Sequence, residues 1–503
     1  KRIAATVGCD ISHIDLFNLH IADRPIIAAL CGQVDMESDM KDFYKIEGRV
    51  GDIAILDSSK LYRPQDEILL DVFTKRDTTH AIINNGDFSL NLDANGGYKK
   101  LMNIGDRFMT ELNKQIRGKY IDQSRLRRTL PIAHIALNTG SENFICRALK
   151  KMGYKIGNAN MNLTSSPKTG LNGWMEAVNL NVDSIQLDTL RLNLISDENT
   201  MRYSGQIRNN KKNPQYVFNA LFDGGIHEHG TYLNGKIYDA KDRLGLSSGI
   251  TATMESNGIR VTLADNDPIL GYKRFHVNSD NYAFLGDDKR VSANIKLTAD
   301  DGTGVQVYTT DSTEALQDVT IGLHKFDLEK IMSVIPYTPD VSGIMDGDFH
   351  VIQTKDNITV SSAINIDNLI YEGSKMGNVG SEFVYMPKSD GSHHVDGYLT
   401  VNSRDVASIV GTYNSKGQGY LDATLKMDRT PLSLINGFIP DKIIGLKGYG
   451  EGELSVKGTL SKPQVNGEIY MDSSYLVSEP YGVEMRFDDD PVRIIGSHLL
   501  FEN

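Results

Sequence analysis

Apolar and polar residues alternate with a period of two along most of the chain. In a β-strand this spacing places the apolar side chains on one face and the polar side chains on the other. The pattern is clearest in four stretches, residues 259–263, 291–297, 358–366 and 421–427. Turn sequences such as Asn257-Gly258 separate the alternating stretches, which is typical of antiparallel strands joined by short loops. The pattern predicts a mainly all-β fold with one apolar and one solvated sheet face.

Helical spacing replaces the alternation mainly in one region. Apolar residues three and four apart predict an amphipathic helix over residues 98–120. A second helix is predicted from Ser141, its expected N-cap, to Gly153, its expected end. We therefore expect a small helical insert at residues 98–155, between a β-rich segment at 1–97 and a second at 156–325.

The last part of the chain, residues 326–503, contains a weak internal repeat. Residues 331–351 resemble residues 435–456, with Gly343 aligned to Gly448 and Gly347 to Gly452. Each copy predicts a short helix followed by a turn and a strand. Asp327 and Thr430 are the expected N-caps of the two short helices.

Three strings in this repeat region resemble one known family. They are PLSLINGFIPD at 431–441, GLKGYGEGELSVKGTLSKPQVNGEIYMDS at 445–473 and SEPYGVEMRFDDDPVRIIGS at 478–497. A Gly-x-Gly-x-Leu-x-Val-x-Gly strand followed by a Lys-Pro-x-Val-x-Gly turn is similar to TamB-like translocation and assembly module proteins. Residues 71–102 and 371–387 are also similar to that family.

The resemblance implies a fold and a cellular setting. TamB-like proteins belong to the AsmA-like, bridge-type lipid transfer superfamily, whose fold is an elongated curled antiparallel sheet forming a β-taco-like hydrophobic groove. The resemblance places the segment in the periplasm, tethered to the inner membrane by an anchor outside it. The chain begins at Lys1, and we interpret it as an excised segment. The implied partners are phospholipid acyl chains, a BamA-like outer-membrane barrel of the TamA type and outer-membrane protein clients.

The expected function is to bind acyl chains and to support phospholipid transport to, and protein assembly in, the outer membrane. Each CH₂ removed from water contributes ~0.8 kcal/mol, so a C16 chain gains on the order of 10 kcal/mol. The candidates for the groove lining are the apolar members of the alternating strands: Ile259, Val261, Leu263, Ile295, Leu297, Ile358, Val360, Ile364, Ile366, Leu421, Leu425, Leu454, Val456 and Ile469.

Other interpretations of the same residues stay open. Alternation alone favours the closed core of an ordinary β-sandwich over an open groove. A chaperone-like scaffold would instead offer sheet edges to the strands of outer-membrane barrels by β-augmentation, without carrying lipid. A glycan-binding sandwich would expose clustered aromatic residues, and the single tryptophan, Trp174, gives it little support.

Composition excludes several classes of function. The net charge of −12 has the wrong sign for nucleic-acid binding. The three cysteines, Cys9, Cys31 and Cys146, form no CxxC motif. A disulfide between Cys9 and Cys31 is compatible with the sequence in an oxidising compartment. No stretch of the chain approaches 18 apolar residues.

The remaining motifs favour structural interpretations. The two imidazoles of His227-Glu228-His229 lack a third metal ligand nearby, and Asp488-Asp489-Asp490 lacks an EF-hand loop. His393-His394 has no evident partner. Arg125, Arg127 and Arg128 suit anionic lipid headgroups, although packing of the neighbouring helix on the sheet is favoured. We expect no cofactor, no metal and no enzymatic activity.

Overall fold

The structure is a computed structural model of the 503-residue chain. It describes residues 2–500 except 16, 19–24, 58–59, 64–65, 152, 183–184, 211–216, 265–266, 311–314, 337, 356, 417–418, 440–443, 460, 479–480 and 488–490. Strands make up 67% of the residues and helices 10%, and the strands pair antiparallel. The prediction of a mainly all-β fold is confirmed.

The chain divides into two compact units. Unit 1 comprises Lys1–Asp242 and Thr251–Ser256. Its sheet is built from β1 (Ile3–Asp15), β2 (Ile26–Ser38), β3 (Tyr44–Asp57), β4 (Lys60–Tyr62), β5 (Ile68–Lys75), β6 (Thr78–Asn85), β7 (Phe88–Ala94), β8 (Ala133–Thr139), β9 (Tyr154–Lys155), β10 (Asn158–Ser166), β11 (Gly170–Val182), β12 (Ile185–Ser196), β13 (Met201–Asn209), β14 (Phe218–His227) and β15 (Gly230–Tyr238).

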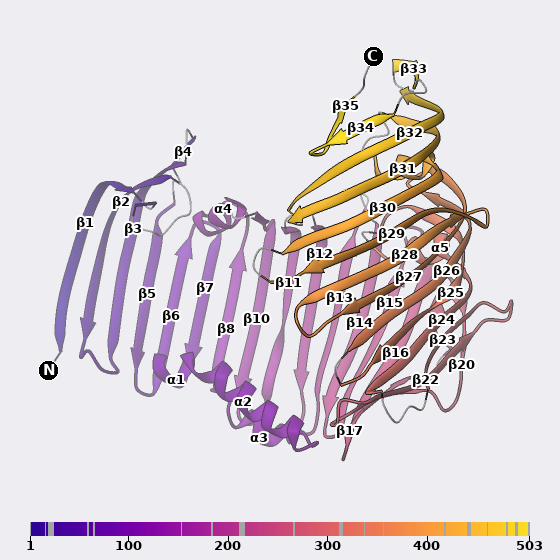
Figure 1. The fold of residues 1–503 in the computed structure, drawn as a ribbon. Helices are drawn as coiled ribbons and strands as arrows, with labels where there is room; N and C mark the ends of the chain where they lie inside the picture. The colour runs from indigo at the N-terminus through magenta and orange to yellow at the C-terminus, as the bar shows by residue number, and fades with distance from the viewer. Residues whose placement is uncertain are drawn as a thin grey trace. The chain divides into compact units, whose positions relative to one another are not determined.

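The helices of unit 1 lie at the ends of these strands. Figure 1 shows α1 (Tyr98–Met102), α2 (Ile104–Arg117) and α3 (Gln123–Arg127) along one end, and α4 (Phe144–Lys151) at the other. The prediction of a single helix over residues 98–120 is wrong in one respect, because the helix is interrupted at Asn103, between α1 and α2. The Asn103 side-chain amide donates to the Lys99 carbonyl oxygen at 3.0 Å.

The second predicted helix also starts later than expected. Asn143, and not Ser141, caps α4, because the Asn143 Oδ1 atom accepts a hydrogen bond from the Cys146 amide at 2.7 Å. Gly153 follows the helix with a φ of 92°, as expected for a helix end. Between α3 and α4 the chain returns to the sheet, where β8 pairs with β7 and β10.

The two N-terminal cysteines face opposite sides of the sheet. Cys9 on β1 pairs with Gly32 on β2, whereas Cys31 pairs with Asp10. An offset of one residue reverses the face of a strand side chain, so the ladder separates the two sulfur atoms. All three cysteines are free, and the bridge left open by the sequence is absent.

Unit 2 comprises Arg243–Ile250 and Asn257–Asn503, and its sheet is curled (Figure 1). Its strands are β16 (Leu244–Glu255, shared with unit 1), β17 (Gly258–Leu263), β18 (Ile269–Leu270), β19 (Lys273–Arg274), β20 (His276–Val277), β21 (Tyr282–Gly286), β22 (Val291–Thr298), β23 (Gly304–Thr309), β24 (Gln317–Asp327), β25 (Val341–Gln353), β26 (Ile358–Tyr371), β27 (Ser374–Pro387), β28 (Ser392–Val401), β29 (Arg404–Asn414), β30 (Tyr420–Pro431), β31 (Gly445–Thr459), β32 (Lys462–Ser478), β33 (Val483–Arg486), β34 (Val492–Ile495) and β35 (His498–Leu500).

The two copies of the repeat have similar local structures. A short helix, α5 (Leu328–Met332), precedes β25, and the 3₁₀ helix η1 (Leu432–Phe438) precedes β31. Asp327 caps α5 as predicted, because its side chain accepts from the Lys330 amide at 3.2 Å. Thr430 does not cap η1. Its hydroxyl instead donates to the Val406 carbonyl oxygen, which ties the end of β30 to β29.

Two clusters of buried apolar residues lie among the described residues of unit 2. The first contains Phe275, Leu297 and Ala299. The second contains Met427, Leu432 and Leu454, so η1 contributes Leu432 to a cluster that otherwise consists of strand residues. Half-buried apolar residues pack around each cluster.

Candidate functional site

The fourteen groove candidates lie on one face of the unit 2 sheet. Residues directly opposite each other in an antiparallel ladder share a face. One row of such pairs crosses the sheet from β22 to β31, in the order Ile295, Val307, Ile321, Phe349, Ser362, Phe383, Gly397, Ile409, Leu425 and Leu454. We call the face that contains this row the apolar face.

The other candidates join this face through their own pairs. Ile259 pairs with Leu285, which pairs with Val291, and Val261 and Leu263 follow Ile259 at steps of two. Six further candidates are an even number of positions from the row residue of their own strand, which places them on the same face. They are Leu297 on β22, Ile358, Val360, Ile364 and Ile366 on β26, and Leu421 on β30. Val456 pairs with Val465, and Ile469 pairs with Gly452. Candidates from six strands, β17, β22, β26, β30, β31 and β32, therefore build one surface.

Most of the apolar face is accessible to solvent. Leu297 and Leu454 are each 8% exposed, and the other twelve candidates are half-buried. Two row residues that sequence reasoning did not select, Ile321 and Ile409, are 38% and 40% exposed. A closed sandwich core would bury such side chains almost completely. The position of Ile321 and Ile409 on this face follows from the register, which the alternation pattern does not give.

The opposite face of the same strands is charged. Lys457 on β31 lies 3.2 Å from Asp422 on β30, and Arg493 on β34 lies 3.1 Å from Glu468 on β32. Exposed pairs of this kind contribute little to stability, but they show that this side of the sheet faces water. The sheet of unit 2 therefore separates an apolar surface from a charged one.

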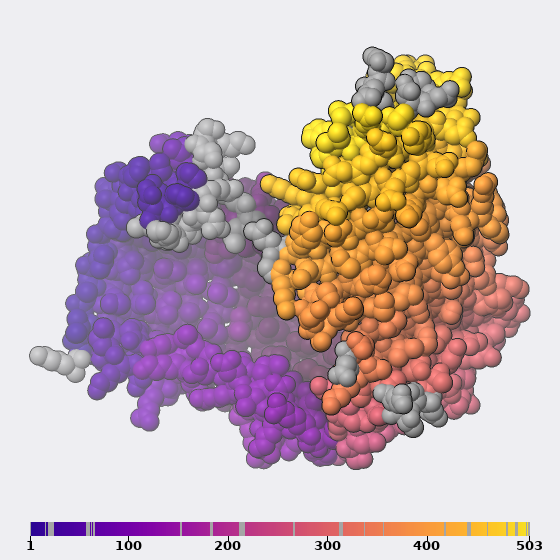
Figure 2. All heavy atoms as spheres, viewed as in Figure 1, coloured from indigo at the N-terminus to yellow at the C-terminus, as the bar shows by residue number. Residues whose placement is uncertain are grey.

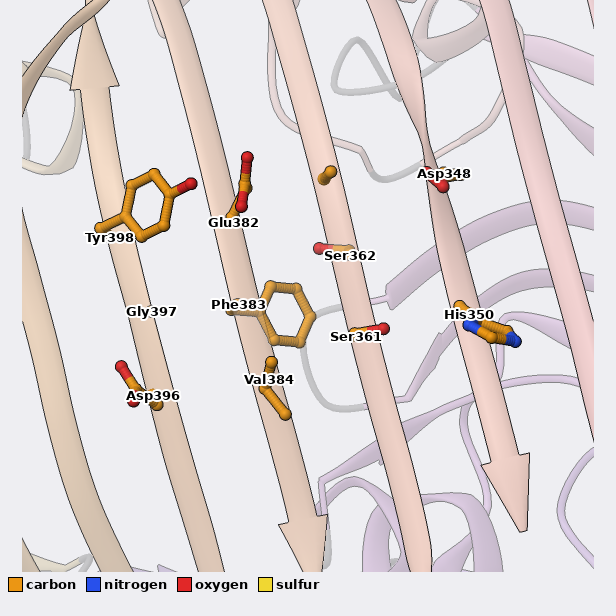
Figure 3. A pocket seen from close by; sticks show the side chains of 11 residues that line it. Asp348, His350, Ser361, Ser362, Glu382, Phe383, Val384, Asp396, Gly397 and Tyr398 are labelled. Carbon is orange, nitrogen blue, oxygen red and sulfur yellow. The ribbon is translucent and has the colours of Figure 1, made fainter.

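A depression lies on the charged face. It has a volume of about 430 Å³ and crosses β25 to β28 (Figure 3). The small residues Ser361 and Ala363 on β26 leave it open between longer neighbours. The Tyr398 hydroxyl donates to the Glu382 carboxylate, which raises the pKa of Tyr398 above its ordinary value. Sequence reasoning did not single out this depression, although small residues between longer ones were its visible signal.

The apolar face also carries a cluster of three polar aromatic side chains, His393, Tyr413 and Tyr385. His393, on β28, stands opposite Tyr413 on β29, and its Nδ1 atom lies 2.7 Å from the Tyr385 hydroxyl on β27. The Tyr385 and His393 rings stack with centroids 5.8 Å apart. The sequence identified no partner ligand that would make His393 a metal site, and the structure gives it hydrogen-bonding and stacking partners on neighbouring strands.

The other sequence motifs take structural positions. The His229 ring packs edge-on against Tyr120, and the Ile121 amide donates to the Glu228 carbonyl oxygen at 2.7 Å. Among the described residues, no group of three or more His, Cys, Asp or Glu side chains could hold a metal ion. Asp488-Asp489-Asp490 lies outside the described residues.

Comparisons with known proteins identify no relative. No protein-family model, no curated protein and no solved structure matches the chain. Within the described part of the chain, no helix has the length and apolar character needed to cross a bilayer.

Proposed function

We propose that the apolar face of unit 2 binds lipid acyl chains in an open hydrophobic groove. The observation that carries this proposal is the row of pairs from Ile295 to Leu454, which is half-buried or exposed over most of its length and runs through ten strands. A bound chain would cover these side chains and gain ~0.8 kcal/mol for each buried CH₂. The charged opposite face keeps the groove wall in contact with water.

The proposal extends to the cellular role that the sequence resemblance implies. In it, the segment is the periplasmic part of a TamB-like protein, tethered to the inner membrane by an anchor outside these residues. It carries phospholipid toward the outer membrane and supports protein assembly there with a BamA-like barrel of the TamA type. The apolar and charged faces on opposite sides of the unit 2 sheet support the lipid-binding part of this role. The sequence resemblance of residues 431–497 is the basis for the periplasmic location, the anchor and the protein partners.

Lipid analysis of the purified chain tests the proposal. The protein is prepared without detergent, extracted, and analysed for acyl lipids by mass spectrometry. The matched variants are Leu425→Asp on the apolar face and Thr424→Asp on the opposite face of the same strand. We expect lipid in the wild type and in Thr424→Asp, and a loss of most lipid in Leu425→Asp at similar far-ultraviolet circular dichroism.

Two results would contradict the proposal. One is a wild-type preparation that contains no acyl lipid, and the other is equal lipid loss in both variants. Binding of extended peptides from outer-membrane barrels without lipid uptake would instead support the scaffold interpretation, in which sheet edges pair with client strands.

A further inference from the structure

The helical segment of unit 1 has a charge opposite to that of the whole chain. Residues 98–128 contain nine Lys or Arg and three Asp or Glu, a net charge of +6 in a protein whose net charge is −12. Figure 1 shows α1, α2 and α3 along one end of the strands of unit 1, and Figure 2 shows their atoms on the visible surface. Basic charge is therefore concentrated at one end of this sheet.

The same helices expose apolar side chains. Met102 at the end of α1 is 77% exposed, and Met109 and Ile116 on α2 are 50% and 38% exposed. Met109 and Ile116 are seven residues apart, a spacing of two helical turns that places them on one face. Gln115 on another face of α2 is buried, so the helix is held by the protein on that side and presents this apolar stripe to solvent.

A basic pocket lies where α1 meets α2. It has a volume of about 300 Å³, and its lining includes Arg76, Lys99, Lys100, Asn103 and Arg107. The Lys99 ammonium donates to the Lys41 carbonyl oxygen at 2.7 Å and lies 3.4 Å from Asp42. With respect to the described residues, Arg76, Lys100 and Arg107 make no ion pair. Of the four cations that line the pocket, Lys99 is paired with the Asp42 carboxylate, and the other three have no ion pair among the described residues.

Two of the arginines singled out from the sequence have structural partners instead. Arg125 lies 2.6 Å from the Glu111 carboxylate. Arg127 donates to the Asp197 and Glu198 carbonyl oxygens at 2.7 and 2.8 Å. The cations that are available to an external anion lie nearer to α1 and the start of α2.

We propose that α1 and α2 dock on the surface of a bilayer that contains anionic phospholipid. Met102, Met109 and Ile116 enter the interface between headgroups and acyl chains, and the Arg76–Lys100–Arg107 pocket holds a headgroup phosphate. Apolar and basic residues on one exposed helix are the combination that such interfaces bind. This surface lies in unit 1 and does not depend on acyl binding by the apolar face of unit 2.

Vesicle flotation of the full chain tests the proposal. The probes are vesicles of phosphatidylcholine alone and of phosphatidylcholine with about one third phosphatidylglycerol. Each Lys or Arg near an anionic surface contributes ≈ 1 kcal/mol, about fivefold in affinity. We expect binding to the anionic vesicles only, a loss of ten-fold or more in Lys100→Gln/Arg107→Gln and in Met102→Asp/Met109→Asp, and a loss in high salt.

Matched controls separate this surface from general charge and apolar effects. Arg404→Gln/Lys416→Gln removes two exposed cations of unit 2, and Met485→Asp changes a methionine that is 56% exposed there. Both controls should bind like the wild type. Equal binding to neutral vesicles, no binding to either vesicle, or an equal loss in the controls would overturn the proposal, as would retained binding in both helix variants.

A fluorescence measurement locates the contact. The chain has one tryptophan, Trp174, so Met109→Trp in a Trp174→Phe background reports from α2 alone. We expect a blue shift of the emission with anionic vesicles and none with neutral vesicles. An unshifted spectrum while anionic vesicles are bound would place the membrane contact outside α2. If the chain instead bound an acidic protein and no vesicles, the surface would be assigned to a protein partner.

Discussion

Gly347 and Gly452 hold equivalent positions in the two copies of the repeat. Their φ angles are 148° and 155°, in the region that side-chain-bearing residues rarely adopt. A Cβ atom at either position would overlap a carbonyl oxygen of the neighbouring strand, that of Ala363 or that of Glu468. The repeat seen in the sequence therefore reflects a shared requirement for close contact between long strands.

Gly452→Ala should destabilise unit 2 by about 1–3 kcal/mol, the usual cost of a strained backbone residue. Gly322→Ala on β24 is the matched control, because its Cβ would meet no atom within 4 Å. Chemical denaturation of both variants measures the difference. A Gly452→Ala protein as stable as the control would show that the close approach is not required.

His276 should titrate above its ordinary range. The carboxylates of Asp300 and Asp267, 3.2 and 3.3 Å from its ring nitrogens, raise the pKa of His276 above the usual 6.5. This contribution to stability is complete below the unfolded pKa of about 6.5 and is lost as the pH rises through the folded pKa. An NMR titration of the imidazole should give the raised value, and Asp300→Asn should lower it. A wild-type pKa at or below 6.5 would contradict the geometry.

At the scale of elements, the sequence predicts the type of structure better than its boundaries. Alternation correctly predicts strands because it reports one apolar and one polar face, and helical spacing correctly locates α2 and α4. A side-chain hydrogen bond accompanies the break at Asn103, and another forms the cap at Asn143. Ser141 and Asn143 are both good N-cap residues, so the sequence alone could not decide between them.

Replacement of Ser141 and Asn143 in turn tests which of them caps α4. Asn143→Ala should cost about 1–2 kcal/mol for the lost cap, and more because its buried side-chain amide also donates to Asp87 and Thr139. Ser141→Ala should be nearly neutral, because the Ser141 hydroxyl bonds only to the exposed Glu142 carboxylate. Thermal unfolding compares the two variants, and equal costs would restore Ser141 as the cap.

At the scale of the whole molecule, the pairing of strands decides which residues share a surface. The alternation predicted the inward and outward positions within each strand, but the combination of β17, β22, β26, β30, β31 and β32 candidates on one face follows from the register of every ladder between them. Bulges such as those after Leu323 and after Met427 shift that register. No local pattern reports such shifts, so Ile321 and Ile409 were not selected.

The charge distribution at this scale could be read from the sequence only in part. The excess of acidic residues was evident, whereas the basic helical segment of unit 1 becomes a surface only when Met102, Met109 and Ile116 are known to be exposed. The helical pattern alone favoured packing of that helix on the sheet. In the structure one face of α2 is buried at Gln115, and another face exposes Met109 and Ile116.

The most direct test of the central claim is site-specific photocrosslinking in cells, followed by separation of lipid from protein adducts. The probe is placed in turn at Ile358, Ile364, Leu421 and Leu425 on the apolar face, and at Thr359, Asn365, Asp422 and Thr424 on the opposite face of the same strands. We predict lipid adducts at the first four positions and few at the second four. Lipid adducts at neither set, or equally at both, would contradict an acyl-binding groove on this face.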